Sequence, residues 1–332
     1  MNQERKTVVI TGASAGIGRA TARRFAADGA RIGLLARGRD GLEATRQEVE
    51  SLGGQALTIP TDVSDPQAVE QAADAVEAAF GPIDIWVNNA FAGIFSPFMK
   101  MSEEEFRRVT EVTYFGQVHG TRSALKRMLP RNRGVIVLVG SALAYRGIPL
   151  QSAYCGAKHA LQGFQDSVRS ELLHLESDVH LTMVQLPGIN TPQFDWVRAH
   201  VPGKPKPTGA VYQPEVAADA IHFAAHARRK QVVVGVPAVQ AIWADKFVSP
   251  LLDRYLGWTG FSGQQAEEAV SPDRQDNLFE PVPGDHGAHG RFDAQAKGSS
   301  LQLWATKHRT GLAAAAGAAA LGAGLLLRAR SR

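Results

Sequence analysis

Seven short apolar runs, separated by stretches with helical patterning, constrain the fold of this 332-residue chain more than any other feature. Most of these runs are continuous and rich in Val and Ile, which is typical of strands that are buried on both faces. They lie at residues 7–10, 31–36, 56–60, 83–87, 135–139, 180–185 and 231–235. Strand and helix therefore alternate, and this predicts a doubly wound α/β fold, in which a Rossmann-type parallel sheet carries helices on both faces.

The helical stretches between the runs have recognisable ends. The clearest of them are residues 17–28, 42–52, 68–80 and 153–176. Asp65 and Pro66 are expected to be the N-cap and the first residue of the third helix, because a carboxylate accepts from free backbone N–H groups and proline needs no acceptor there. Gly81 and Pro82 are expected to end that helix before the fourth run.

The composition divides the chain into three regions. Residues 1–258 carry the alternating pattern and are expected to form one dinucleotide-binding catalytic domain. Residues 259–300 hold many Gly, Gln, Asp and Pro and few large apolar groups, which predicts a linker or weakly ordered arm. Residues 301–332 are expected to form an apolar C-terminal helix.

The last region contains an uncharged segment, residues 311–327, made only of Ala, Gly and Leu. As a helix it would span about 26 Å, which is near the lower limit for a bilayer core. Trp304, Lys307 and Arg328 flank it with side chains that favour a membrane interface. No signal-peptide pattern precedes the first run, so we expect a cytoplasmic domain attached to a membrane by this tail. The alternative is an Ala-rich helix that packs on the protein or on a partner.

The composition also argues against several classes of function. The net charge of +4 is small for this length, and the first 250 residues hold no dense Lys/Arg stripe, so we expect no nucleic-acid partner. Cys155 is the only cysteine, which excludes an internal disulfide and a Cys-rich zinc site. His222 and His226 are four residues apart, as metal ligands can be, but no third ligand accompanies them, and we expect no metal site.

A glycine-rich loop, TGASAGIG, follows the first run at positions 11–18 and leads into a helix. Gly12, Gly16 and Gly18 allow the backbone to turn sharply and to approach a pyrophosphate closely, and the helix directs free N–H groups at that anion. Ser14 and Ile17 complete this expected phosphate-binding loop. Its spacing differs from the commoner G-x-G-x-x-G, and the alternative is a tight strand-to-helix turn without a ligand.

Residues after the next three strands are expected to line the rest of a cofactor cleft. Arg37 follows the second run, where an acidic residue would bind the ribose of NAD, so the arginine favours the 2′-phosphate of NADP(H). The alternative is a solvated loop charge. Asp62 and Val63 are expected to flank the adenine, with the carboxylate accepting from its amino group. Asn89 and Ala90 end the fourth run and are expected to line the crevice.

Tyr154 and Lys158 are candidates for proton transfer. They are four residues apart in a stretch with helical character, so they lie on one face of the helix. A free tyrosine has a pKa near 10, and a neighbouring ammonium lowers that value by favouring the phenolate. Ser141 follows the fifth run and is expected to hold the substrate oxygen during hydride transfer. The alternative is a surface pair at helical spacing.

Residues 5–250 of the chain resemble the classical short-chain dehydrogenase/reductase family. The motifs that carry this resemblance are TGASAGIG (11–18), NNA (88–90), Ser141, YCGAK (154–158) and PGINTP (187–192). The resemblance implies that Ser141 donates to the substrate oxygen, that Tyr154 is the general acid–base, and that Lys158 binds the cofactor ribose and modulates the tyrosine. It also implies a homodimer or homotetramer.

The resemblance extends to the nicotinamide end of the site. It implies that Pro187, Gly188, Ile189 and Thr191 lie near the nicotinamide carboxamide. One position departs from the family, which usually has an asparagine where this chain has Thr113. That asparagine is thought to hold a water of a proton relay, and since a threonine hydroxyl also binds water, we expect an altered relay.

The sequence thus predicts an oxidoreductase that transfers a hydride between NADP(H), or less favourably NAD(H), and a small apolar alcohol or carbonyl compound. Phe194 and Trp196 are candidates for lining an apolar substrate pocket, and the loop 189–213 is expected to shape it. The alternative is a non-catalytic NADP(H)-binding sensor or scaffold protein that uses its tail for localisation.

Overall fold

A seven-stranded parallel sheet forms the centre of the computed structural model, which describes residues 5–271 and 273–317. Its strands are β1 (Thr7–Thr11), β2 (Arg31–Ala36), β3 (Gln55–Pro60), β4 (Ile85–Asn88), β6 (Val135–Ser141), β7 (His180–Leu186) and β12 (Gln231–Val233). Their order in the sheet is β12-β7-β6-β4-β1-β2-β3, and every neighbouring pair is parallel. The seven predicted strands and the doubly wound fold are therefore confirmed.

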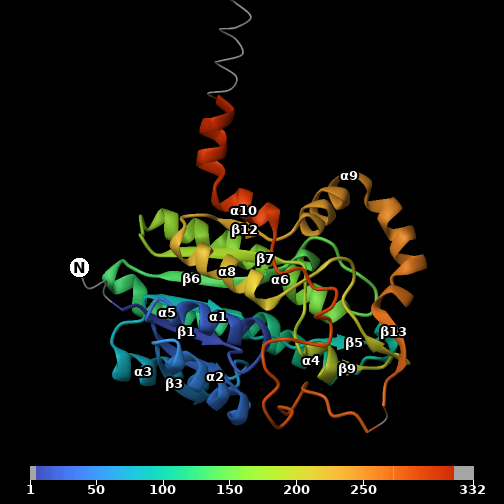
Figure 1. Cartoon of the computed structure of the whole chain (residues 1–332), viewed down its shortest axis with the longest axis horizontal. Helices are drawn as coiled ribbons and strands as arrows, with labels where there is room; N and C mark the ends of the chain where they lie inside the picture. The colour runs from blue at the N-terminus through green and yellow to red at the C-terminus, as the bar shows by residue number, and fades with distance from the viewer. Residues whose placement is uncertain (1–4, 272, 318–332) are drawn as a thin grey trace, which may run out of the picture.

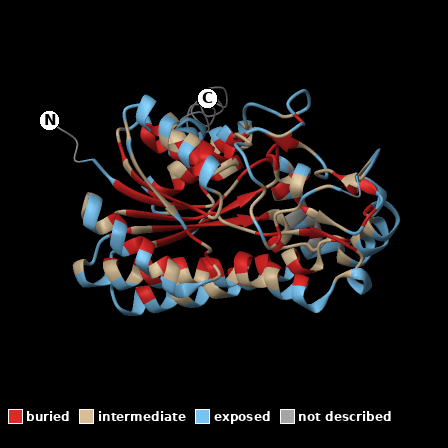
Figure 2. Cartoon of the chain, turned by 90° about the horizontal axis from the view of Figure 1, so that it is seen from below, coloured by how far each residue is buried: buried red, intermediate tan, exposed pale blue. Residues whose placement is uncertain are grey.

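Two layers of helices enclose the sheet (Figures 1 and 2). One layer contains α1 (Gly16–Ala26), α2 (Arg39–Ser51) and α8 (Pro214–His226), and the other contains α3 (Pro66–Phe80), α4 (Glu103–Thr110), α5 (Gly116–Met128) and α6 (Ser152–His174). Alternate residues of β1 serve the two layers: Val8 and Ile10 pack with Phe25 of α1, whereas Val9 packs with Val76 of α3. This two-sided burial explains why the strand sequences are continuously apolar.

Helix ends follow the local sequence signals. The Asp65 carboxylate accepts from the Gln67 backbone N–H at 2.8 Å, Pro66 is the first residue of α3, and Gly81 ends the helix with φ +82°. α4 begins with a reciprocal capping box between Ser102 and Glu105. These N-terminal residues satisfy backbone N–H groups that have no partner within the helix.

Smaller elements lie beyond the carboxyl ends of the sheet strands. They are the strand pairs β5 (Ile94–Phe95) with β9 (Arg198–Ala199), β8 (Gly188–Ile189) with β11 (Val211–Tyr212) and β10 (Gly203–Pro205) with β13 (Gln265–Ala269), and the helices α7 (Gln193–Trp196) and α9 (Val236–Thr259). α9 is kinked at Val248, two residues before Pro250, whose ring disfavours a continuous helix. Together these elements build a cap over one edge of the sheet.

The region 259–300 differs from the linker or weakly ordered arm that its composition predicts. Leu278, Ala288 and Phe292 are buried, and β13 pairs with β10 of the domain. Figure 1 shows the segment, in orange to red, running back across the domain between β13 and α10 (Leu301–Lys307). A few spaced apolar side chains suffice to hold it, because polar groups of the domain supply the remaining contacts.

The C-terminal helix is described only in part. α10 packs on the domain through the buried Leu303, and Lys307 forms an ion pair with Asp219 of α8 at 2.7 Å. Of the apolar segment 311–327, residues 318–327 lie outside the described residues. Within the part of the chain that the structure describes, no helix is both long and apolar enough to cross a membrane.

Candidate active site

A cavity of about 580 Å³ lies at the carboxyl ends of the sheet strands. It opens where the strand order reverses, since β1 lies between β2 on one side and β4 on the other, and this is the position at which doubly wound folds bind ligands. The predicted site residues that line it are Gly12, Ser14, Gly16, Ile17, Arg37, Asp62, Val63, Asn89, Ala90, Ser141, Tyr154, Lys158, Pro187, Gly188, Ile189 and Thr191. Gly18 and Thr113 are not among the residues that line it.

The glycine-rich loop connects β1 to α1. Gly16 has φ +54°, a left-handed conformation that favours glycine, and it begins the helix. No side chain caps this helix, and Gly16 and Ile17 of its first turn line the cavity. The Gly16 backbone N–H donates to the Gly287 carbonyl oxygen at 3.1 Å, so an anion at this helix end would use the N–H groups that follow it. Gly18 lies inside the first turn against the loop backbone, because a Cβ there would be 2.1 Å from the Gly12 carbonyl oxygen.

Gly18→Ala is therefore expected to lower the free energy of unfolding by about 1–3 kcal/mol, since the loop must move to admit one methyl group. Urea denaturation measures the change. Gly163→Ala in α6 is the matched control, because nothing lies within 4 Å of its Cβ, and it should leave stability unchanged or raise it slightly. Equal stability of the two variants would contradict the close approach at Gly18.

Asn89 holds the glycine loop in place and lines the cavity at the same time. Its side-chain N–H groups donate to the carbonyl oxygens of Thr11 at 2.9 Å and Gly12 at 3.3 Å. The Thr11 hydroxyl accepts from the backbone N–H groups of Asn89 at 2.9 Å and Ala90 at 3.0 Å. Thr11 is a positioning residue that sequence reasoning missed, although its place directly before Gly12 could have suggested it.

The predicted adenine-binding carboxylate, Asp62, is engaged by the protein. It forms an ion pair with Arg108 of α4 and accepts from the Ser64 hydroxyl at 2.7 Å. Burial opposes its ionisation, but the hydrogen bonds from Arg108 and Ser64 outweigh burial and hold the pKa of Asp62 below its usual value. The carboxylate thus fixes α4 against this wall, and Arg108 is a second residue that the sequence did not single out.

Ser141, Tyr154 and Lys158 meet at the end of β6 and the first turns of α6. The Ser141 hydroxyl oxygen accepts from the Leu143 backbone N–H at 3.1 Å, and the hydroxyl is hydrogen-bonded with Tyr154. The Lys158 ammonium lies 5.6 Å from the centre of the Tyr154 ring and donates to the Val139 carbonyl oxygen at 2.6 Å. The three side chains therefore form one group at the wall of the cavity.

Burial governs the protonation of this group. It raises the pKa of Tyr154 above its ordinary value, and the opposing hydrogen bond with Ser141 is the weaker influence. Burial also lowers the pKa of Lys158 to about 7. The expected lowering of the tyrosine pKa by the lysine is thus not what governs this group: burial dominates, and at neutral pH Tyr154 carries its proton.

Thr113 lies in a π-helical turn, Glu111–Phe115, between α4 and α5. Its hydroxyl donates to the Ala92 carbonyl oxygen at 2.8 Å and accepts from the Ala92 backbone N–H at 2.9 Å. These two bonds fix the segment that follows β4 and use the only proton of the hydroxyl. A role for Thr113 in a proton relay stays a prediction.

The remaining wall of the cavity is largely apolar. Phe194 and Trp196, the two aromatic candidates from the sequence, both line it. They are joined by Phe91, Phe95, Leu143, Ile148, Val197, Leu252, Tyr255 and Leu256. The last three come from α9, which follows the last sheet strand in the sequence. The strand and helix pattern did not connect α9 with the site, because the helix reaches the cavity through tertiary packing alone.

The segment after β13 supplies a further wall that sequence reasoning missed. Its residues in the cavity are Asn277, Pro281, Val282, Gly284 and His286, the last in edge contact with the Trp196 ring at 4.5 Å. No local sequence pattern indicated that these residues lie at the site.

His222 and His226 have the spacing of metal ligands in the sequence. In the structure, His222 Nε2 contacts an Asp28 carboxylate oxygen at 2.6 Å. Within the described residues, no group of three His, Cys, Asp or Glu side chains could hold a metal ion.

Comparison with known proteins shows that this chain is similar to short-chain dehydrogenases in sequence and in structure. The sequence model of the short chain dehydrogenase family matches residues 6–201. The uncharacterized oxidoreductase YxnA of Bacillus subtilis is 32% identical over 85% of this chain and 80% of its own length. The fatty acyl-CoA reductase of Acinetobacter baylyi is 29% identical over 86% of this chain and 96% of its own length. A solved metagenomic short-chain oxidoreductase in complex with NADP is 28% identical, with 69% of this chain and 96% of that chain covered and a TM-score of 0.58.

Proposed function

Because this chain belongs to the short-chain dehydrogenase family, we propose that it transfers a hydride between NADP(H) and an alcohol or carbonyl substrate. The observation that carries the proposal is the shared cavity: the glycine loop and the group of Ser141, Tyr154 and Lys158 line the same space. A cleft that served only to bind a nucleotide would need no partly buried tyrosine beside a buried lysine at its wall. The alternative, a non-catalytic sensor or scaffold protein, leaves this group unexplained.

The residues of this chain would divide the chemistry as follows. The nicotinamide, when bound, supplies or accepts the hydride. Ser141 holds the substrate oxygen by a hydrogen bond, and Tyr154, protonated at neutral pH, gives a proton to that oxygen as it gains charge during reduction. Lys158 Nζ lies over the tyrosine ring, 5.6 Å from its centre, and the protonated form of the lysine would stabilise the phenolate that remains.

The preference for NADP(H) is supported by the charge at the adenosine end. Arg37 lines the cavity there. Within the described part of the chain, its guanidinium donates hydrogen bonds only to backbone carbonyl oxygens. Carbonyl groups carry no net charge, so the arginine keeps a positive charge for a 2′-phosphate. The complex of a related oxidoreductase with NADP agrees with this assignment.

The apolar wall supports an apolar carbonyl compound as the substrate. Aromatic and aliphatic side chains from α7 and α9 line the cavity that Tyr154 also lines. Similarity to a fatty acyl-CoA reductase over 86% of this chain is consistent with a long aliphatic chain. We therefore propose that aldehydes or ketones with long apolar chains are reduced in preference to short ones.

The proposal is tested by following NADPH oxidation with aliphatic aldehydes and ketones of increasing chain length and with quinones. We expect kcat/KM to rise with chain length, since each buried methylene contributes about 0.8 kcal/mol, or about fourfold. Turnover that does not depend on chain length would refute the substrate class. NADPH binding without turnover of any compound would favour the sensor or scaffold alternative.

A further inference from the structure

We propose that residues 276–293 form a cofactor strap, which completes the dinucleotide site and positions Arg37 for the 2′-phosphate of NADP(H). The inference rests on the proposed use of NADP(H). It adds that a segment outside the sheet and its helices decides the cofactor preference. The evidence is the path of the strap, its anchors and its contacts with Arg37.

The strap follows the cleft from one end to the other. At the adenosine end its backbone meets Arg37. At the phosphate loop the Gly287 carbonyl oxygen accepts from the Gly16 backbone N–H at 3.1 Å. At the nicotinamide end the Asn190 side-chain oxygen accepts from the Phe292 backbone N–H at 3.0 Å. A dinucleotide that lies along the carboxyl ends of β1 and β4 would therefore have the strap beside it over its whole length.

Three aspartates anchor the strap to the domain. Asp276 accepts from Arg198 Nε at 2.9 Å. Asp285 forms an ion pair with the buried Arg19 of α1. Asp293 accepts from the side-chain N–H groups of Asn190 at 2.8 Å and Gln213 at 3.0 Å. Because each anchor lies near one part of the cleft, the strap is fixed at both ends and in the middle.

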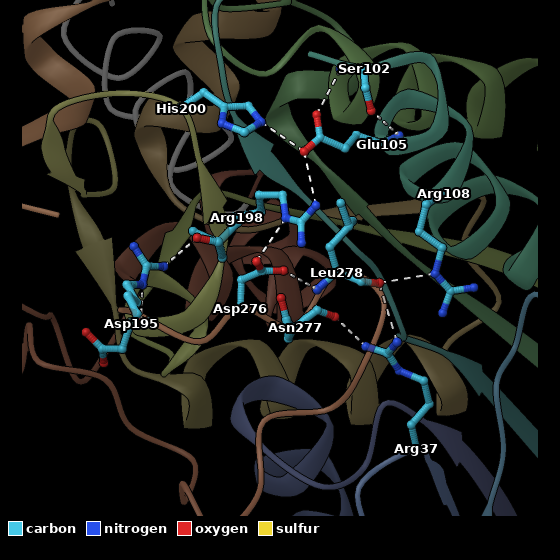
Figure 3. A network of polar contacts seen from close by, with 12 residues as sticks. Arg37, Ser102, Glu105, Arg108, Asp195, Arg198, His200, Asp276, Asn277 and Leu278 are labelled. Carbon is cyan, nitrogen blue, oxygen red and sulfur yellow. Dashed lines mark hydrogen bonds and ion pairs between the residues drawn. The ribbon is translucent and has the colours of Figure 1, made fainter. Parts of the chain in front are cut away.

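The strap backbone holds the Arg37 guanidinium in one orientation. The carbonyl oxygens of Asn277, Leu278 and Phe279 all accept from the Arg37 guanidinium, as Figure 3 shows for the first two. The Leu278 carbonyl oxygen also accepts from Arg108 Nε at 3.1 Å. Three carbonyl groups fix the plane of the guanidinium without neutralising it, and two of its five N–H donors remain for a phosphate.

Asp276 shapes the turn that presents these carbonyl groups. Its carboxylate accepts from the Leu278 backbone N–H at 3.0 Å and from Arg198. Arg198 also donates to the buried Glu105 of α4 at 3.1 Å, so the turn is tied to the helix that lies next to Arg37 (Figure 3). Loss of the Asp276 carboxylate would release the turn, and the Arg37 guanidinium would gain rotamers that do not face the cofactor.

The test compares the dissociation constants of NADPH and NADH for the full chain and its variants, by fluorescence titration. We expect Asp276→Ala to raise the constant for NADPH about tenfold, which equals the loss of one charge-assisted hydrogen bond, and to change that for NADH by less than about twofold. Asp276→Asn keeps an acceptor for Leu278 and should have an intermediate effect. Glu268→Gln is the matched control, since its exposed ion pair with Lys204 lies in β13, away from the cleft.

The other outcomes with the Asp276 variants would refute the strap, whereas the outcome with an Arg37 variant would refute the NADP(H) preference. Equal weakening of NADPH and NADH would reduce Asp276 to a structural role, and tighter binding of NADPH would make the strap an obstacle rather than a positioning element. Both results refute the inference, as does no change in either constant. If Asp276→Ala does not fold, as judged by thermal unfolding, the Asn variant decides between the same outcomes. If Arg37→Ala leaves the NADPH constant unchanged, the proposed NADP(H) preference itself fails.

Discussion

Replacement of Tyr154 by phenylalanine is expected to lower kcat by about 10²–10⁴-fold, which is the usual contribution of a positioned general acid. The substitution removes one hydroxyl from a partly buried ring and keeps the apolar contact with Phe91, whose ring centre lies 5.8 Å away. The substrate oxygen would then gain charge with Ser141 as its only donor from the group. Steady-state kinetics with NADPH and the best substrate of the panel measures the loss.

The dissociation constant of NADPH separates a chemical role from a binding role. We expect it to stay within about twofold of the unmodified chain, since the phosphate loop and Arg37 lie away from the tyrosine hydroxyl. Tyr145→Phe is the matched control, because this hydroxyl donates to Gln231 at 2.7 Å and does not line the cavity. Tyr154→Phe with unchanged kcat would rule out the tyrosine as the acid.

Replacement of Lys158 by methionine is expected to raise the free energy of unfolding at pH 7 by about 2–4 kcal/mol. Burial lowers the pKa of Lys158 from 10.5 to about 7. Such a shift corresponds to a destabilisation of about 5 kcal/mol, from which about 1–3 kcal/mol is subtracted because the Val139 carbonyl oxygen loses its donor. A stability gain with loss of turnover is the pattern expected of a buried functional charge.

The pH dependence gives this prediction its sign. Between pH 10.5 and about 7 the unfolded chain binds the Lys158 proton and the folded chain does not, so the stability of the unmodified protein falls as the pH falls through this window. The advantage of the variant is therefore full below about pH 7 and disappears near pH 10. Urea denaturation at several pH values measures it. Lys126→Met, an exposed lysine beside Glu70, should change stability by less than about 1 kcal/mol at every pH, and a pH-independent gain for Lys158→Met would contradict the buried charge.

Several parts of the site could be predicted because their signals are local. A glycine loop between an apolar strand and a helix, as at Gly12–Gly18, specifies its conformation within a few residues. Tyr154 and Lys158 share a helix face by their spacing alone. These residues also carry the resemblance to a family, which extended the prediction to Pro187 and Thr191.

The residues that hold other parts of the site in place could not be predicted from such local signals. Thr113 holds Ala92, and Asn89 holds the loop at Gly12, through partners 21 and 77 residues away in the sequence. The protonation of Tyr154 depends on how completely the fold excludes water from it, which no spacing reports. The sequence predicted that the lysine lowers the tyrosine pKa, but the packing shows that burial raises it.

What the sequence alone determined is the alternation of strands and helices, the glycine-rich loop and the order of the candidate catalytic residues. All of these follow from periodicity and from residues that are close in the chain. The tertiary structure decided the position of residues 276–293, whose polar composition predicts a linker or weakly ordered arm. Their stability comes from Asp276, Asp285 and Asp293 meeting Arg198, Arg19 and Asn190, and such long-range pairing has no period in the sequence because it exists only after the domain has folded.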